Sequence, residues 1–113
     1  MSIHNNKRYE NEFVRLMISK GYHCERVAGS GSGRNAVCDC ILFKEGKVYL
    51  VEVKATKEKK FYYRKNVVEQ LRIMKEVAKK HGVSSMLAVK IKRRGWRFYE
   101  DEEYLTTKGI LSG

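Results

Sequence analysis

Residues 47–54 place the strongest constraint on how this chain can fold. Between positions 48 and 53 the sequence reads Val-Tyr-Leu-Val-Glu-Val, so apolar side chains fall on both alternating faces of an extended segment. This pattern is typical of a strand in the middle of a sheet that is covered on both sides. A carboxylate in such a strand, here Glu52, is costly unless it is paired or used. We therefore expect a central strand that carries a functional or ion-paired acid.

The preceding segment, residues 36–43, is predicted to be the hairpin partner of this strand. A short connection that contains glycine, residues 44–46, joins the two segments. Asp39 interrupts the apolar run of the partner segment, and antiparallel pairing would bring Asp39 close to Glu52. Lys54 lies two residues after Glu52, so the two side chains project from the same face of the strand. The hairpin therefore predicts two carboxylates and an ammonium group in one place.

The rest of the chain alternates helical and extended patterns. Apolar residues at helical spacing predict helices over residues 5–20 and 66–81. Further short strands are predicted over residues 22–27, 86–91 and 96–99. The order is a helix, three strands, a helix and two strands. This order indicates an α/β fold with a mixed central β-sheet flanked by helices, in a single domain spanning residues 1–113.

The charge of the chain favours a polyanionic partner. Twenty-four Lys and Arg residues against 13 Asp and Glu residues give a net charge of +11. The resulting positive field attracts phosphate backbones, which points to nucleic acid, although ribosomal and membrane-surface proteins can be equally basic. No apolar run approaches the length of about 18 residues that a membrane span requires, so no membrane partner is expected. Without a signal-peptide pattern, we expect a cytoplasmic, nucleoid-associated protein with three reduced cysteines.

Asp39, Glu52 and Lys54 together indicate phosphodiester hydrolysis. Two neighbouring carboxylates repel each other, and a divalent cation is the usual remedy. Asp39 and Glu52 would hold one or two Mg²⁺ ions, which activate a water and neutralise charge in the transition state. Lys54 would orient or activate the nucleophile and stabilise the developing charge. The alternative interpretation is a structural salt bridge within the hairpin.

Glu10 flanks the buried stripe of the first predicted helix. A carboxylate there could approach the site and bind metal directly or through water. The alternative is a carboxylate favoured at that position by the helix dipole. Glu12 is a weaker candidate because it lies on a different face of the helix.

Asp39 and the run Glu52-Val53-Lys54 resemble the PD-(D/E)xK motif of many restriction enzymes and DNA-repair nucleases. More of the chain resembles one branch of that superfamily, the archaeal Holliday junction resolvases of the Hjc type. The further segments that carry the resemblance are Tyr9-Glu10-Asn11-Glu12, Lys20-Gly21-Tyr22, Arg26-Val27-Ala28-Gly29-Ser30, Phe61-Tyr62-Tyr63-Arg64, Met86-Leu87-Ala88-Val89-Lys90 and Gly95-Trp96-Arg97-Phe98.

This resemblance implies a restriction-endonuclease-like core and a homodimer that nicks two opposing strands of a four-way DNA junction, with Mg²⁺ or Mn²⁺, in recombination and repair. It implies that the catalytic set is Glu10, Asp39, Glu52, Lys54 and Ser30, with Glu10, Asp39 and Glu52 as metal ligands. Asn11 departs from the family, which often has arginine there. One expected phosphate contact is thereby removed, and Lys7 or Arg8 could replace it. Sliding clamps and branch-migration proteins are possible further partners that leave no mark in the sequence.

Two segments are expected to contact DNA in addition to Arg26, whose counterpart in the family is functional. Glycines at residues 29–33 let the backbone approach phosphates, and a basic run with interleaved aromatic residues follows the catalytic strand. The expected DNA-binding residues are Arg26, Ser30, Ser32, Arg34, Lys57, Lys59, Lys60 and Arg64. The alternatives are a flexible turn and a solvated charge run. At the level of function, the alternatives are a PD-(D/E)xK nuclease acting on duplex or flapped DNA and a non-catalytic basic DNA-binding module.

Overall fold

The computed structural model describes residues 6–28, 36–57, 60–62, 65–101 and 110–112. Within them the elements follow in the order α1 (Asn6–Ser19), β1 (His23–Arg26), β2 (Cys40–Lys44), β3 (Lys47–Thr56), β4 (Lys60–Tyr62), α2 (Lys65–Lys80), β5 (Ser84–Ile91), β6 (Gly95–Glu100) and β7 (Ile110–Ser112).

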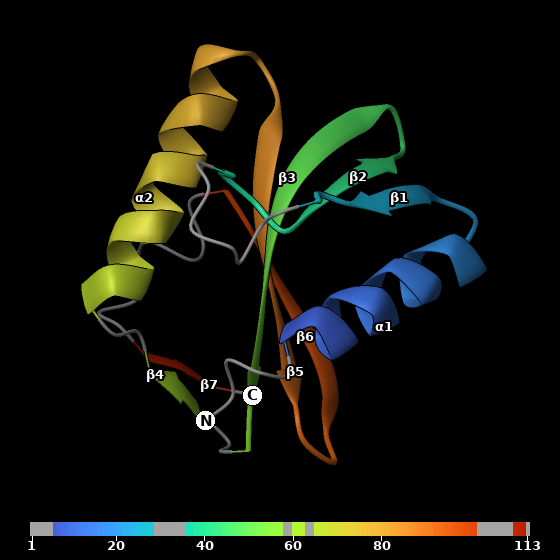
Figure 1. Cartoon of the computed structure of the whole chain (residues 1–113), viewed down its shortest axis with the longest axis vertical. Helices are drawn as coiled ribbons and strands as arrows, with labels where there is room; N and C mark the ends of the chain where they lie inside the picture. The colour runs from blue at the N-terminus through green and yellow to red at the C-terminus, as the bar shows by residue number, and fades with distance from the viewer. Residues whose placement is uncertain (1–5, 29–35, 58–59, 63–64, 102–109, 113) are drawn as a thin grey trace.

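Strand β3 is the central strand of a five-stranded sheet, as its two apolar faces predict. The strand order is β1-β2-β3-β5-β6, and β4 and β7 form a separate antiparallel pair (Figure 1). Strands β3 and β5 are parallel, while the other neighbours in the main sheet are antiparallel. A parallel pair needs a long crossover connection, which here contains α2. The expected α/β fold with a mixed central sheet is therefore confirmed.

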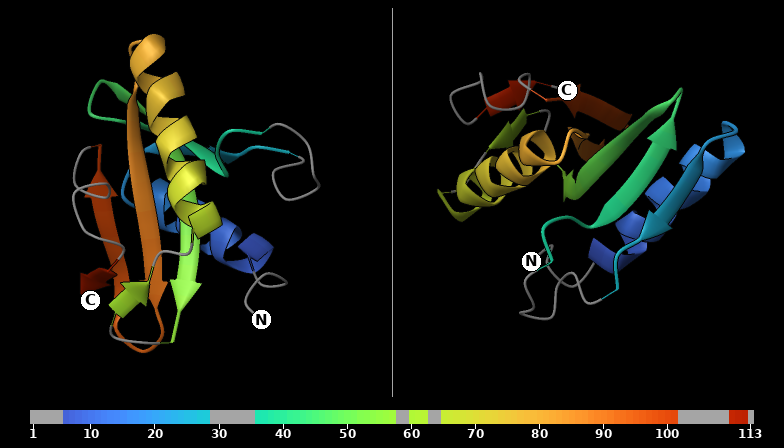
Figure 2. Two further views of the ribbon diagram at one scale, coloured as in Figure 1. Left: turned by 90° about the vertical axis from the view of Figure 1, so that its left-hand side faces the viewer. Right: turned by 90° about the horizontal axis from the view of Figure 1, so that it is seen from above.

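The two helices cover opposite faces of the sheet (Figure 2). On one face, Phe13 of α1 packs in a buried cluster with Val51 and Val53 of β3. On the other face, Leu71 of α2 packs in a second buried cluster with Leu87 of β5. Because side chains alternate along a strand, each central strand contributes to both clusters. This double burial explains why β3 carries apolar residues at nearly every position.

The connection between β2 and β3 is a two-residue turn. Lys44 pairs with Lys47, which leaves Glu45 and Gly46 at the tip with φ angles of 52° and 81°. Two successive positive φ angles are characteristic of the type I′ turn, whose twist matches that of a hairpin. The predicted hairpin is confirmed, and its turn fixes the register of the strands that carry the acidic residues.

Several boundaries differ from the sequence prediction. Strand β2 begins at Cys40 instead of residue 36, and β5 begins at Ser84, two residues early. Strands β4 and β7 were not predicted, and Lys60, a member of the predicted basic run, lies in β4. A three-residue strand is too short for a periodic pattern, and β4 pairs with a segment about fifty residues away in sequence.

The three cysteines, Cys24, Cys38 and Cys40, are free thiols and buried, as expected. Among the described residues, no helix combines the length and apolar character needed to cross a membrane.

Candidate active site

Asp39 lies at the point where β2 leaves the sheet. The ladder between β2 and β3 ends with Cys40 opposite Val51, and Asp39 is the residue that comes just before this pair in the chain. The Asp39 backbone N–H donates to the Val51 carbonyl at 2.9 Å, and its carboxylate Oδ2 accepts from the Val53 N–H at 2.9 Å. The Asp39 carboxylate thus accepts the hydrogen bond from the Val53 N–H that a backbone carbonyl of β2 would accept if the ladder continued. This bond fastens the Asp39 carboxylate to the central strand.

Glu52 and Lys54 project together from the α2 side of β3, as their spacing predicts. Glu52 is buried, and its Oε2 lies 3.3 Å from Nζ of Lys54. The same ammonium group donates a long hydrogen bond of 3.5 Å to Oε1 of Gln70 on α2. Lys54 is therefore held between an acid on its own strand and an amide on the covering helix.

The environment of Glu52 disfavours its charged form. Burial and the charge of Asp39, only partly offset by Lys54, raise the pKa of Glu52 to about 8. Glu10 contributes to the same rise. A bound cation would act in the opposite direction and favour the ionised carboxylate.

Glu10 approaches this region from α1. Its side chain is buried, and its Oε1 accepts a 3.2 Å hydrogen bond from Nε of Arg26 at the end of β1. Burial and the nearby Asp39 carboxylate raise the pKa of Glu10, while the Arg26 guanidinium opposes that rise. The prediction that Glu10 faces inward is confirmed, so three carboxyl groups and two cations converge here.

The donor chemistry of this site fits Mg²⁺, although the protein side chains alone do not form a closed cage of ligands. Among the described residues, no group of three or more His, Cys, Asp or Glu side chains is arranged to hold a metal ion. Mg²⁺ is commonly bound by one or two carboxylates, with water and substrate phosphates completing its octahedral shell. Asp39 and Glu52 could supply such a pair of oxygen ligands.

The ion pair between Glu52 and Lys54 also matches the purely structural interpretation of the triplet. That interpretation does not explain why Asp39 and Glu10, both less than 9% exposed, stand beside Glu52 instead of facing solvent. Burying like charges together is unfavourable, and active sites are where such arrangements concentrate. The convergence of three acids therefore favours the catalytic interpretation.

The structure describes only part of the expected DNA-contacting set. Lys57 is exposed directly after β3, and Arg26 is half-buried in its ion pair with Glu10. For Lys60 only the backbone is described, in β4. The remaining predicted residues, Ser30, Ser32, Arg34, Lys59 and Arg64, lie outside the described residues.

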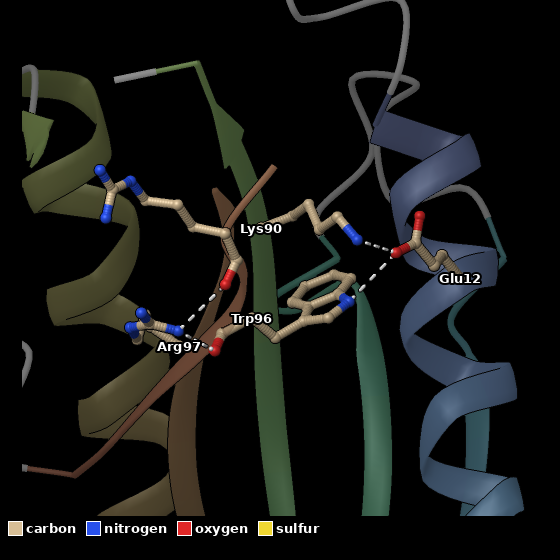
Figure 3. Close-up of polar contacts among 5 residues, drawn as sticks. Glu12, Lys90, Trp96 and Arg97 are labelled. Carbon is tan, nitrogen blue, oxygen red and sulfur yellow. Dashed lines mark hydrogen bonds and ion pairs between the residues drawn. The ribbon is translucent and has the colours of Figure 1, made fainter. Parts of the chain in front are cut away.

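Glu12 points away from the carboxylates, consistent with its different helix face. Its Oε2 accepts from Nζ of Lys90 at 2.5 Å and from Nε1 of Trp96 at 3.2 Å (Figure 3). Burial alone would raise the pKa of Glu12, but the hydrogen bonds from Lys90 and Trp96 and the charges of Lys90 and Arg8 together lower it. Trp96 also packs against Phe13, at the border of the buried cluster that contains Phe13. This contact ties α1 to β5 and β6.

Gln70 is a neighbour of the site that lies outside the predicted set of catalytic residues. It lies next to Leu71, one of the buried residues of α2, so the helical period places it at the border of the buried face. An amide at such a border is ordinarily a surface residue. The hydrogen bond between Lys54 and Gln70 depends on how α2 packs across β3, which the sequence pattern does not specify.

A mixed sheet with two acids and a lysine on its central hairpin matches the restriction-endonuclease-like core that the resemblance implies. The chain belongs to the archaeal Holliday junction resolvase (Hjc) family, whose model matches residues 1–111. It is 34% identical over 93 residues to the crossover junction endodeoxyribonuclease Hjc of Archaeoglobus fulgidus, covering 81% of this chain and 65% of that protein. The chain thus spans slightly under two thirds of the length of that relative.

A solved structure shares this architecture. The structure of Archaeoglobus fulgidus Hjc, described as a Holliday junction resolvase from an archaeal hyperthermophile, matches with a TM-score of 0.65 and 32% sequence identity. The match covers 80% of this chain and 72% of that one. This likeness supports the restriction-endonuclease-like fold that the resemblance implied.

Proposed function

We propose that this protein is a metal-dependent endodeoxyribonuclease that resolves four-way DNA junctions by paired nicks in opposing strands. The observation that carries the proposal is the group of Asp39, Glu52 and Lys54, with Asp39 fastened to β3 and Glu52 buried beside it. The net charge of +11 and membership of the Hjc family support DNA as the substrate.

Asp39 and Glu52 are proposed to hold Mg²⁺, with Glu10 acting directly or through water and Mn²⁺ as a substitute. One or two bound ions would lower the pKa of a water and neutralise charge on the phosphate. Lys54 holds the attacking water or a phosphate oxygen, and Gln70 restricts the ammonium group to that position. No protein nucleophile is required.

The DNA backbone is proposed to contact residues around this site. Lys57 is exposed at the end of β3, and Arg26 can exchange its contact with Glu10 for a phosphate. Ser30 is proposed to act in catalysis. The other members of the proposed DNA-binding set are Ser32, Arg34, Lys59, Lys60 and Arg64.

Resolution requires two cuts, so we propose a homodimer with one site in each subunit. Twofold symmetry suits a junction whose opposing strands are equivalent. Mixed dimers that carry one Glu52→Gln subunit should then nick one strand and leave the opposing strand intact. A single subunit that cuts both strands would contradict the dimeric arrangement.

The experiment that tests the proposal compares three DNA substrates of equal length and base composition: a four-way junction, a linear duplex and a flap. We expect paired nicks in the junction with Mg²⁺, and little cutting of the other two. Equal cutting of duplex and junction would show that the protein is a general nuclease and not a junction resolvase. No cutting of any substrate with Mg²⁺ or Mn²⁺ would leave only a non-catalytic DNA-binding module.

A further inference from the structure

The turn between β5 and β6 carries three consecutive cations to which the proposed mechanism gives no role. Lys92, Arg93 and Arg94 are all exposed. Among the described carboxylates, none forms an ion pair with these three side chains. Their charges are therefore available to an external anion.

The turn lies at the same edge of the sheet as the end of the catalytic strand. Strands β3 and β5 run parallel, with Thr56 opposite Ile91, and the Lys92 N–H donates to the Thr56 carbonyl at 2.9 Å. Glu52 precedes Thr56 by four residues on β3, a separation of about 13 Å in an extended strand. This is well within one turn of duplex DNA, about 34 Å. A duplex engaged at the carboxylates can therefore reach the turn.

The turn is a braced structure. The Arg94 N–H donates to the Ile91 carbonyl at 2.9 Å, and Nη1 of Arg97 donates to the carbonyls of Trp96, at 3.0 Å, and Arg94, at 3.5 Å (Figure 3). Arg97 thus neutralises backbone oxygens that would repel a phosphate approaching the turn. The cations are presented from a fixed backbone, so little ordering of the chain is needed when they bind.

Arg93 adopts a φ of 70°, in the left-handed region. Glycine and asparagine adopt this conformation more readily than a long side chain does. Folding alone therefore favours one of those residues at this position. The arginine instead provides a charge at the tip of the turn, in line with a role in binding.

We propose that Lys92, Arg93 and Arg94 bind backbone phosphates of the duplex arm that flanks the cut. This inference rests on the proposed function, since it takes DNA held at Asp39 and Glu52 as its starting point. It assigns the β5–β6 turn to the positioning of that arm. Phosphate contacts of this kind fix register and orientation without reading sequence.

The test compares two double variants that each remove two positive charges. The first is Arg93→Asn with Arg94→Gln in the turn. The matched control is Lys79→Gln with Lys80→Gln, in the last turn of α2 at the opposite end of the sheet (Figure 1). Asparagine suits the backbone of position 93, so the turn variant should keep or raise its melting temperature. A loss of binding could then not be attributed to unfolding.

Junction affinity is measured in EDTA, which prevents metal-dependent cutting, across a range of salt concentrations. We expect the turn variant to bind about tenfold more weakly and to lower the slope of log K against log salt by about 2, because two phosphate contacts are lost. The control should change affinity by less than about threefold, since only the general field of the protein is reduced. Equal effects of the two variants would overturn the inference.

Uncharged methylphosphonate linkages locate the contact. Placed in the arm near the cut, they should weaken binding of the wild-type protein and of the control, yet have little further effect on the turn variant. Additive losses in the turn variant would contradict the assignment to those phosphates. If the wild-type protein neither binds nor cuts a junction, the proposed function itself fails, an outcome distinct from failure of the turn alone.

Discussion

The Asp39 carboxylate accepts a 2.9 Å hydrogen bond from the backbone N–H of Val53, one residue beyond Glu52 on the central strand. This bond forms because β2 departs from the sheet at that point and leaves the Val53 N–H without a strand partner. The regular ladder ends at Cys40, and at Asp39 a side-chain carboxylate bonds to the central strand instead of a backbone carbonyl. The Asp39 side chain therefore satisfies a backbone donor of the sheet, and the same hydrogen bond fixes the position of its carboxylate.

Substitutions of Asp39 separate these two roles. Asp39→Asn keeps an oxygen for the Val53 N–H, so it should leave the free energy of unfolding within about 1 kcal/mol of wild type while abolishing cleavage. Asp39→Leu should also lose about 1–3 kcal/mol of stability, because a buried donor is left unsatisfied. Urea unfolding and junction cleavage measure the two effects. An asparagine variant that cleaves normally would exclude Asp39 as a metal ligand.

The raised pKa of Glu52 predicts how stability depends on pH. Its pKa rises from 4.5 to about 8 on folding, so the folded state binds more protons than the unfolded state between these values. The stability that Glu52 contributes is thus fully present below pH 4.5 and is lost as pH rises through about 8. Without divalent metal, unfolding free energy should fall from about pH 5 to about pH 8.5 more steeply in wild type than in Glu52→Gln. Equal slopes would show that Glu52 ionises normally.

A bound metal ion should compete with the proton on the Glu52 carboxyl group. Mg²⁺ requires an ionised ligand, so its stabilisation of the folded protein should be larger at about pH 8.5 than at about pH 6. Thermal unfolding with and without Mg²⁺ at the two pH values measures this, and Glu52→Gln should show little shift at either. A shift in melting temperature that is independent of pH in wild type would place the ion away from Glu52.

Gln70 is predicted to position Lys54. Gln70→Leu removes the 3.5 Å contact without changing the charge of the site and should lower kcat about tenfold with little effect on KM, as expected for loss of orientation. Gln70→Asn keeps an amide on a shorter side chain, so its kcat should lie between that of the wild type and that of Gln70→Leu. Glu69→Gln, on the exposed face of the same helix, is the control and should match wild type. If the kcat of Gln70→Leu also equals that of the wild type, the contact between Gln70 and Lys54 has no catalytic role.

Much of this fold was predictable because local patterns agree with the final contacts. The two apolar faces of β3 reflect its burial under both helices, and the turn at Gly46 reflects a φ that few other residues adopt. The spacing of Glu52 and Lys54 places both on one face whatever the tertiary structure. These features depend on residues close in sequence.

The features that were not predicted depend on segments far apart in the chain. The pairing of Lys60–Tyr62 with Ile110–Ser112, the contact of Gln70 with Lys54, and the ion pair of Arg26 with Glu10 each require two distant segments to meet. The spacing of apolar residues along the sequence does not indicate which distant segments come into contact. The early departure of β2 was also hidden, because the residues before Cys40 are apolar enough to continue a strand.

The contact of Glu12 with Lys90 and Trp96 is predicted to stabilise the fold without taking part in catalysis. Glu12→Ala should cost about 1–2 kcal/mol of unfolding free energy, within the range for charged hydrogen bonds that are partly exposed. The control pair, Glu69 with Arg72, is more exposed, and Glu69→Ala should cost less than about 0.5 kcal/mol. Cleavage per folded molecule should stay normal. A selective loss of cleavage in Glu12→Ala would instead assign Glu12 to the site.

The central claim is that Asp39, Glu52 and Lys54 form the catalytic site, and single-turnover cleavage of a four-way junction by Glu52→Gln tests it most directly. With saturating enzyme and Mg²⁺, we predict a rate at least about 100-fold below wild type, with junction affinity intact or higher and Glu69→Gln unchanged. A Glu52→Gln protein that cleaves the junction at the wild-type rate would contradict the assignment of this site.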